Sequence, residues 1–111
     1  MGPGLINLGE FQKLELRVGE IVKAEKVEGT KALLALRVNL GEEERTLVAG
    51  LAPYYRPEEM VGKRVVVLAN LEPATIRGIR SEGMLLAADD GKGGVSLLTV
   101  DRDIAPGSKV R

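Results

Sequence analysis

Apolar and polar residues alternate along much of the first half of the chain, which is the pattern expected of half-buried β-strands. Residues 14–27 (LELRVGEIVKAEKV) begin with this alternation, and the apolar face shifts to the next position after Gly19. A glycine that interrupts the alternation predicts a bulge or a sharp bend within one long strand. Residues 32–40 and 45–51 predict two further strands, joined by the charged turn GEEER.

The second half of the chain predicts one short helix and several more strands. Pro57 followed by two glutamates is typical of the first turn of a helix, and Gly62 is suited to end it. The run KRVVVLANL (63–71) is rich in β-branched residues, which predicts a strand buried on both faces. Residues 83–88 and 95–100 predict further strands on either side of the turn DDGKGG.

The order of these elements predicts an all-β protein with the OB-fold. This fold is a five-stranded Greek-key barrel, here with one short helix after the third strand and extra strands at the C-terminal end. The bent first strand fits, because a small barrel closes only when its strands tilt and coil. A generic β-sandwich is the competing architecture. With 111 residues, no repeats and no linker, residues 1–111 are expected to form a single domain.

The composition narrows the possible functions. Lysine plus arginine equals aspartate plus glutamate, 16 each, so any anion-binding surface requires local clustering of basic residues. The chain has no cysteine and no histidine, which excludes disulfides and removes the commonest general base and metal ligand. It also has no phosphate-binding glycine loop. We therefore expect a protein that is not an enzyme and that needs no cofactor and no metal.

The same composition gives an expectation about location. Hydrophobic residues make up 44% of the chain and charged residues 29%, which is typical of a soluble domain with one core. No stretch approaches 18 consecutive apolar residues, and the N-terminus lacks the basic-then-apolar pattern of a secretory signal. The expected location is therefore cytoplasmic.

The connection over residues 70–83 (NLEPATIRGIRSEG) concentrates basic residues. Arg77 and Arg80 lie in a stretch, residues 73–81, that contains no acidic residue. A solvated loop normally carries both signs of charge, and a plain hairpin needs only two turn residues such as Asn-Gly. We therefore predict a longer loop that binds an anion. With only three aromatic residues in the chain, base stacking on aromatic rings is not the expected mode of binding.

Four short motifs occur in order along the chain. They are Leu-Arg-Val-Gly (16–19), Tyr-Tyr-x-Pro-Glu-Glu (54–59), Asn-Leu-x-Pro (70–73) and Ser-x-Gly-Met (81–84). Through these motifs the chain resembles the tRNA-binding domain at the C-terminus of methionyl-tRNA synthetase, and equally the stand-alone tRNA-binding proteins of that family. The resemblance extends from about Phe11 to Arg111.

The resemblance implies an OB-fold homodimer that binds tRNA by its shape and does no chemistry. Two roles are open: a detached subunit whose further partner is a methionyl-tRNA synthetase catalytic subunit, or an independent tRNA carrier. The matching motifs and the basic residues near them give the candidate RNA-binding residues, which are Lys31, Asn70, Arg77, Arg80, Ser81 and Met84. The amide and hydroxyl groups among them could bond to phosphate or ribose, the arginines could pair with phosphates, and the thioether could contact a base or sugar.

Two parts of the family pattern are missing from this chain. Ala32 stands where relatives carry a lysine, and Lys31 precedes it by one position. Ala74 and Thr75 stand where relatives often carry two basic residues. Part of the expected basic surface is therefore absent, and the arginines of residues 73–81 would have to supply it.

Other roles stay open for the same residues and for the whole chain. Asn70 can satisfy a strand end, Ser81 can be an ordinary turn residue, and Met84 can begin a core strand. The export chaperone CsaA shares the fold and the dimer, so a protein-binding module is the alternative function, and the balanced charge favours it. A chaperone needs an exposed apolar groove, whereas a tRNA binder needs a positive strip.

Overall fold

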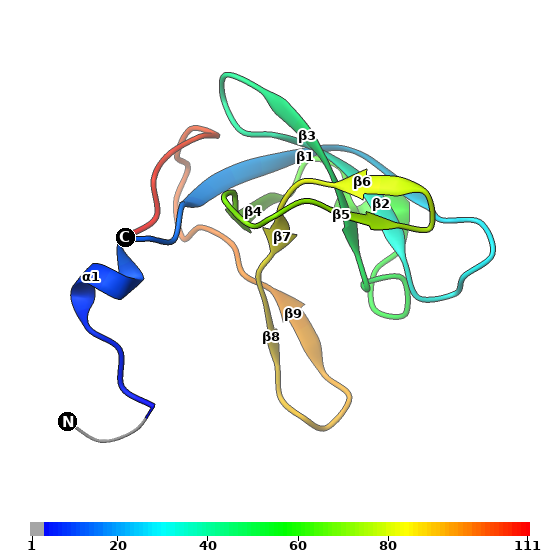
Figure 1. Ribbon diagram of the computed structural model, residues 1–111. Helices are drawn as coiled ribbons and strands as arrows, with labels where there is room; N and C mark the ends of the chain where they lie inside the picture. Colours follow the sequence, from blue (N-terminus) through cyan, green and yellow to red (C-terminus); the bar gives the residue numbers. More distant parts are fainter. Residues whose placement is uncertain (1–3) are drawn as a thin grey trace.

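The computed structural model describes residues 4–111 as a nearly closed antiparallel β-barrel (Figure 1). The main sheet consists of β1 (Leu16–Lys26), β2 (Leu34–Asn39), β3 (Glu44–Ala49), β4 (Arg64–Leu68) and β7 (Met84–Leu85). Their order across the sheet is β3-β2-β1-β4-β7. The backbone N–H of Glu82 donates to the carbonyl oxygen of Thr46 at 2.9 Å, which brings the two ends of the sheet together. The predicted all-β, five-stranded barrel is confirmed.

The core fills the inside of the barrel because the strands turn alternate apolar residues inward. Ile21 of β1 and Leu36 of β2 are fully buried there. On β4 the three consecutive residues Val65, Val66 and Val67 are all buried, which confirms the prediction of a strand covered on both faces. The side chains left free for a binding site are therefore the outward ones of β1, β2 and β3 and those of the connections.

The irregularity in β1 lies at Val22, so the position predicted from the sequence, Gly19, is wrong. The register of β1 with β2 shifts between Ile21 and Lys23, which leaves Val22 as an extra residue. Such a bulge bends the strand and increases its twist. Gly19 is needed for a different reason, because a Cβ there would lie 2.6 Å from Cγ1 of Val38.

Two helices of four residues each occur in residues 4–111, α1 (Leu8–Phe11) and α2 (Pro57–Met60), where the sequence predicted one. The second begins at the predicted position and places the buried Met60 in the core. The first begins with a capping box. The side-chain oxygen of Asn7 accepts a bond from the N–H of Glu10 at 2.9 Å, and the Glu10 carboxylate accepts one from the N–H of Asn7 at 3.1 Å. In the described part of the chain, no helix is long and apolar enough to cross a membrane.

Two small hairpins lie outside the main sheet. They are formed by β5 (Ala74–Ile76) with β6 (Ile79–Ser81), and by β8 (Ala87–Asp89) with β9 (Val95–Leu97). The strand predicted over residues 83–88 is therefore split, since its first part joins the main sheet and its second part joins a hairpin. Figure 1 shows the β8–β9 hairpin projecting from the barrel. The hydroxyl of Tyr55 accepts a hydrogen bond from the N–H of Leu97 at 3.1 Å and so attaches this hairpin to the body.

The C-terminal tail pairs with the first half of β1 in the same chain. The N–H of Gly107 donates to the carbonyl oxygen of Val18 at 2.7 Å. The N–H of Val18 donates to the carbonyl oxygen of Ser108 at 2.9 Å. The tail also packs closely against the β2–β3 turn. The space at Gly107 is too small for a side chain, since a Cβ added there would lie 2.6 Å from the carbonyl oxygen of Leu40. The tail is therefore an integral part of the barrel wall.

Candidate nucleic-acid interface

The basic connection after β4 contains a tight hairpin. The register of β5 with β6 pairs Ile76 with Ile79 and leaves a two-residue turn made of Arg77 and Gly78. Both turn residues have positive φ, +53° and +80°, as in a type I′ turn. The prediction of a longer loop is therefore wrong for this part of the connection. The turn was hidden in the sequence because an arginine occupies the position where asparagine is usual.

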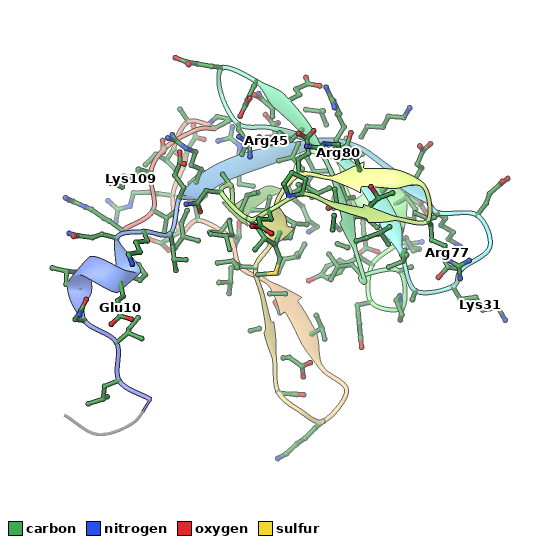
Figure 2. The ribbon with its side chains drawn as sticks, in the orientation of Figure 1. Glu10, Lys31, Arg45, Arg77, Arg80 and Lys109 are labelled. Atoms are coloured by element: carbon green, nitrogen blue, oxygen red, sulfur yellow. The ribbon has the colours of Figure 1, made fainter. Side chains whose placement is uncertain are left out.

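Arg77 lies against the loop that joins β1 to β2. Its Nη1 atom is 4.0 Å from the point where a Cβ of Gly29 would be. Lys31 belongs to the same loop, and Figure 2 shows Lys31 and Arg77 at the same end of the barrel. Both residues are exposed, and neither forms an ion pair within residues 4–111. Two segments far apart in the sequence therefore place free cations at one end of the molecule.

A groove runs from the tip of the β5–β6 hairpin across the outer face of the sheet. Its larger part, about 440 Å³, is lined by Glu25, Lys26, Val27, Glu28, Ala35, Arg77 and Ile79. Its smaller part, about 140 Å³, is lined by Lys23, Glu25, Ala35, Leu36, Arg37 and Thr46. The two parts share Glu25 and Ala35, so they adjoin, and we refer to them together as the β1–β2 groove. OB-folds bind oligonucleotides on the face of their second and third strands and with the loops that follow the first and fourth strands. The β1–β2 groove includes residues of β2 and β3 and of the hairpin after β4.

Arg80 is not beside Arg77, although the sequence suggested a pair. Figure 2 shows Arg77 at the hairpin tip and Arg80 farther back along the hairpin. The Arg80 guanidinium is largely exposed and lies 3.7 Å from the carboxylate of Glu82. Met84 is 45% exposed, so it is not the core residue that its place at the start of β7 suggested. Both side chains face solvent, outside the residues that line the β1–β2 groove.

Ser81 and Asn70 make their hydrogen bonds within the protein. The Ser81 hydroxyl is buried and accepts a bond from the N–H of Val48 on β3 at 3.0 Å. The side-chain oxygen of Asn70 accepts from the N–H of Glu15 at 2.9 Å, and its amide nitrogen donates to the carbonyl oxygen of Lys13 at 2.7 Å. These two side chains hold the segments around the connection in place.

Sequence reasoning missed Arg45, which fixes both ends of the basic connection. Its guanidinium donates to the carbonyl oxygen of Ala69, before the β5–β6 hairpin, and to that of Glu82, after it, at 3.4 Å. The carboxylate of Glu43 forms an ion pair with the same guanidinium at 2.7 Å. An arginine in a strand after a charged turn carries no signal of this role, because the contacts depend on how the barrel closes.

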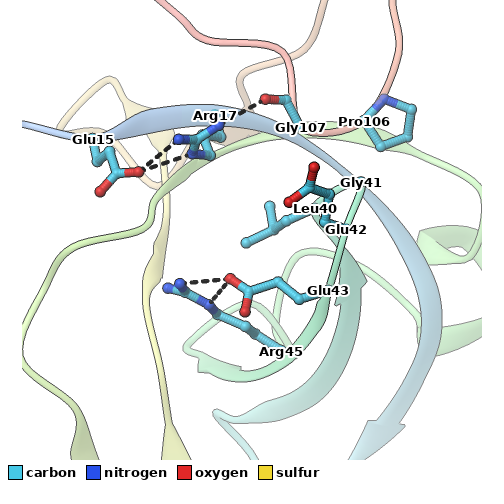
Figure 3. A pocket seen from close by; sticks show the side chains of 9 residues that line it. All are labelled: Glu15, Arg17, Leu40, Gly41, Glu42, Glu43, Arg45, Pro106 and Gly107. Carbon is cyan, nitrogen blue, oxygen red and sulfur yellow. Dashed lines mark hydrogen bonds and ion pairs between the residues drawn. The ribbon is translucent and has the colours of Figure 1, made fainter.

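A larger hollow, about 720 Å³, lies at another part of the surface (Figure 3). It is lined by Glu15, Arg17, Leu40, Gly41, Glu42, Glu43, Arg45, Pro106 and Gly107. Each of its two arginines is already paired with a glutamate at 2.7 Å, Arg17 with Glu15 and Arg45 with Glu43. A hollow whose cations are neutralised in this way is a weak receptor for phosphate, so it is not the candidate interface.

Two carboxylates in the described part of the chain have a pKa below the ordinary value. In the described residues, no three acidic side chains gather in a way that could hold a metal ion. The pKa of Glu59 is lowered mainly because the backbone N–H of Arg56 donates to its carboxylate. The pKa of Asp90 is lowered because the N–H groups of Lys92 and Gly94 donate to it. Neither carboxylate lines the β1–β2 groove.

Comparison with known proteins identifies the family. A family model described as "Putative tRNA binding domain" matches residues 16–109. The chain belongs to this family. It is 55% identical over 106 residues to a methionine–tRNA ligase of Methanocaldococcus jannaschii, which is 96% of this chain but 16% of that protein. The chain therefore spans less than a fifth of the curated relatives that it matches, and the matching family is one of binding domains.

Solved structures agree with this assignment. The MetRS related protein from Pyrococcus horikoshii superposes with a TM-score of 0.92 at 40% identity, covering 96% of this chain and 98% of that one. The chaperone CsaA from Bacillus anthracis superposes with a TM-score of 0.89 at 27% identity, covering 97% and 100%. The predicted relation of this tRNA-binding domain to methionyl-tRNA synthetases is confirmed.

Proposed function

We propose that this domain binds tRNA along the β1–β2 groove, with Lys31 and Arg77 in contact with phosphates. The observation that carries the proposal is that these two cations, free of ion pairs within residues 4–111, lie at the same end of the barrel, where Arg77 lines the groove. Each phosphate that a cation neutralises releases counterions and adds to affinity. With few aromatic side chains available, recognition relies on the RNA backbone and its shape.

The other candidate residues take different parts in this proposal. Arg80 and Met84 are exposed outside the groove lining, and in this proposal they contact parts of a large RNA that extend beyond the groove. Asn70 and Ser81 act indirectly, because their polar groups already bond to the protein backbone and hold the connection in position. The domain itself does no chemistry.

The proposal includes a homodimer that works with a methionyl-tRNA synthetase in the cytoplasm. One copy offers a tRNA few cations, whereas two copies on one extended ligand raise the effective concentration and therefore the avidity. Leu5, Ile6 and Leu8 near the N-terminal end are each at least 60% exposed, and apolar side chains in such a group favour association. Light scattering on the purified protein measures the mass in solution, and a monomer at all concentrations would contradict this part.

The deciding experiment is a titration with tRNA at several salt concentrations, from about 50 to about 200 mM. The wild type is compared with Lys31→Ala/Arg77→Ala. Arg102→Ala/Lys92→Ala serves as the control, because it removes the same two charges from exposed sites outside the groove. We expect the first pair to bind more weakly and to reduce the salt dependence, by roughly 0.7–0.9 in log–log slope for each phosphate that is no longer neutralised.

The alternative function makes the opposite prediction. A protein-binding module like CsaA, whose structure this chain resembles closely, would bind an unfolded apolar peptide and no tRNA at low salt. Equal effects of the two double variants on tRNA affinity would place the RNA elsewhere on the surface. Absence of tRNA binding by the wild type at about 50 mM salt would refute the proposal itself.

A further inference from the structure

Glu25 occupies an unexpected place for a surface that binds a polyanion. It lines both parts of the β1–β2 groove, whereas the second acid, Glu28, lines only the larger part; the other charged lining residues are Lys23, Lys26, Arg37 and Arg77. Glu25 is exposed on the outward side of β1 and makes no ion pair within residues 4–111. A free carboxylate at the middle of the groove repels a phosphate at that position. The ligand must therefore present something other than phosphate there.

The surroundings of Glu25 are suited to a flat, partly apolar group. Ala35, its partner across the β1–β2 pair, contributes only a methyl group to the floor of the groove. Val27 and Ile79 line the larger part beside it and are buried or half-buried. The apolar part formed by Ala35, Val27 and Ile79 can accept the face of a nucleobase, which gains affinity when it leaves water, while charged side chains line the rest of the groove. Arg37 is paired with Glu44 at 3.1 Å. Lys23, Lys26 and Arg77 form no ion pair within residues 4–111 and remain available for the phosphates on either side.

We infer that Glu25 recognises the amino group of an unpaired base that lies on Ala35. A carboxylate only accepts hydrogen bonds, so it favours a base edge that donates. Cytosine presents an N4 amino group, and carboxylates accept bonds from this group in nucleic-acid complexes. Uracil presents a carbonyl oxygen at the same position of a ring of the same size, and this oxygen would face the carboxylate unfavourably. The groove therefore prefers cytidine to uridine at this position. The inference rests on the proposed function, because it assumes that RNA occupies the groove.

The test uses single-stranded cytidine and uridine oligomers of equal length, titrated beside tRNA at one low salt concentration. The proteins are the wild type, Glu25→Gln, and Glu58→Gln as the control, since Glu58 is an exposed acid on α2 outside the groove. We expect the wild type and the control to prefer cytidine by about fivefold to a hundredfold. Because glutamine carries both a donor and an acceptor, Glu25→Gln should bind the two oligomers with nearly equal affinity.

The outcomes separate this inference from the proposed function. An equal gain in affinity for both oligomers on Glu25→Gln would mean that the carboxylate only repels phosphate, and it would overturn the inference. A wild type that binds tRNA but shows no preference between the oligomers would overturn it as well, while the proposed function stands. A wild type that binds neither tRNA nor oligomer would overturn both.

A second variant tests the place of the base independently of charge. Ala35→Leu fills the floor of the groove and leaves every charged side chain in place. We expect it to weaken binding of both oligomers at least tenfold, with thermal unfolding measured in parallel to verify the fold. Unchanged binding by a folded Ala35→Leu protein would show that no base lies on Ala35 and would overturn the inference.

Discussion

The hydroxyl of Ser81 accepts a hydrogen bond from the backbone N–H of Val48 at 3.0 Å, and this bond joins the β5–β6 hairpin to β3. The same hydroxyl donates to the carbonyl oxygen of Gly83 at 3.4 Å. Ser81 is only 5% exposed. A residue that the family resemblance indicated as an RNA contact is therefore placed as an anchor for the hairpin that carries Arg77.

Replacing Ser81 by alanine should destabilise the fold. The N–H of Val48 loses its acceptor in a buried place, which costs about 1–2 kcal/mol of unfolding free energy. Urea denaturation measures this loss. Ser96→Ala is the control, because Ser96 is exposed and its hydroxyl reaches only a carbonyl 3.5 Å away. If Ser81→Ala keeps full stability and still loses tRNA affinity, the hydroxyl contacts the RNA and our placement is wrong.

We expect the side chain of Asn70 to stabilise the fold by joining the segment after β4 to the segment before β1. Asn70→Ala removes both of its bonds, to Glu15 and to Lys13, and we expect a loss of about 1 kcal/mol. Asn70→Asp keeps the acceptor for the N–H of Glu15 but sets a carboxylate oxygen against the carbonyl oxygen of Lys13, so the Glu15 amide should stay protected although the protein is destabilised. Hydrogen exchange of the Glu15 amide is the measurement. Equal exchange in all three proteins would contradict a bracing role.

The architecture could be predicted because it depends on patterns within single segments. The alternation in β1 to β3 and the valine run of β4 follow directly from which faces are buried. The β5–β6 hairpin could not be predicted, because its turn places Arg77 at positive φ, where asparagine or glycine is expected. The bulge was misplaced for a similar reason, since Gly19 is required by contact with Val38 on another strand.

The sequence indicated the two connections that carry Lys31 and Arg77, but it did not indicate the β1–β2 groove. The motifs indicated Arg77, and the loop after the first strand indicated Lys31, and the fold brings these residues to one end of the barrel. The bonds of Asn70 to Glu15 and Lys13, and the bond of Ser81 to Val48, join residues more than 30 positions apart in the sequence, so no local pattern reveals them. The place of Glu25 in the groove likewise depends on how β1 meets β2 and the hairpin.

Arg77→Asn separates the function of the hairpin tip from its stability. Asparagine adopts positive φ more readily than arginine, so Asn-Gly is the better type I′ turn and the unfolding free energy should not fall. Affinity for tRNA should fall, because one of the two proposed phosphate-binding cations at this end of the barrel is removed. The control is Arg102→Asn, which removes an arginine that is exposed outside the groove. A stable Arg77→Asn protein with wild-type affinity would exclude Arg77 from the interface.

The tip of the β8–β9 hairpin should respond to acid. The Asp90 carboxylate accepts bonds from the N–H groups of Lys92 at 2.7 Å and Gly94 at 2.9 Å, and these bonds lower its pKa below the ordinary 3.8. At a pH above the ordinary pKa of an aspartate, these bonds therefore contribute their full stabilisation to the hairpin. This contribution is lost as the pH falls through the lower pKa that Asp90 has in the folded protein.

An NMR titration of the Gly94 amide measures this transition. We expect its midpoint below pH 3.8, because the folded form favours the ionised carboxylate. Asp90→Asn keeps an oxygen acceptor for the two N–H groups but cannot titrate, so the transition should disappear from the Gly94 signal. A wild-type midpoint at or above the ordinary value would show that the backbone bonds do not persist in solution.

Gly107 should be intolerant of any side chain because the tail and the β2–β3 turn meet there backbone to backbone. Gly107→Ala combines a positive φ of +92° with a Cβ only 2.6 Å from the carbonyl oxygen of Leu40. Gly91→Ala is the matched control, since Gly91 has a φ of +72° but nothing lies within 4 Å of its Cβ position. The backbone strain of about 1–2 kcal/mol applies to both variants, whereas the clash applies only to the first. Urea denaturation should therefore show the larger loss for Gly107→Ala, and equal losses would mean that the tail moves away from the barrel at little cost.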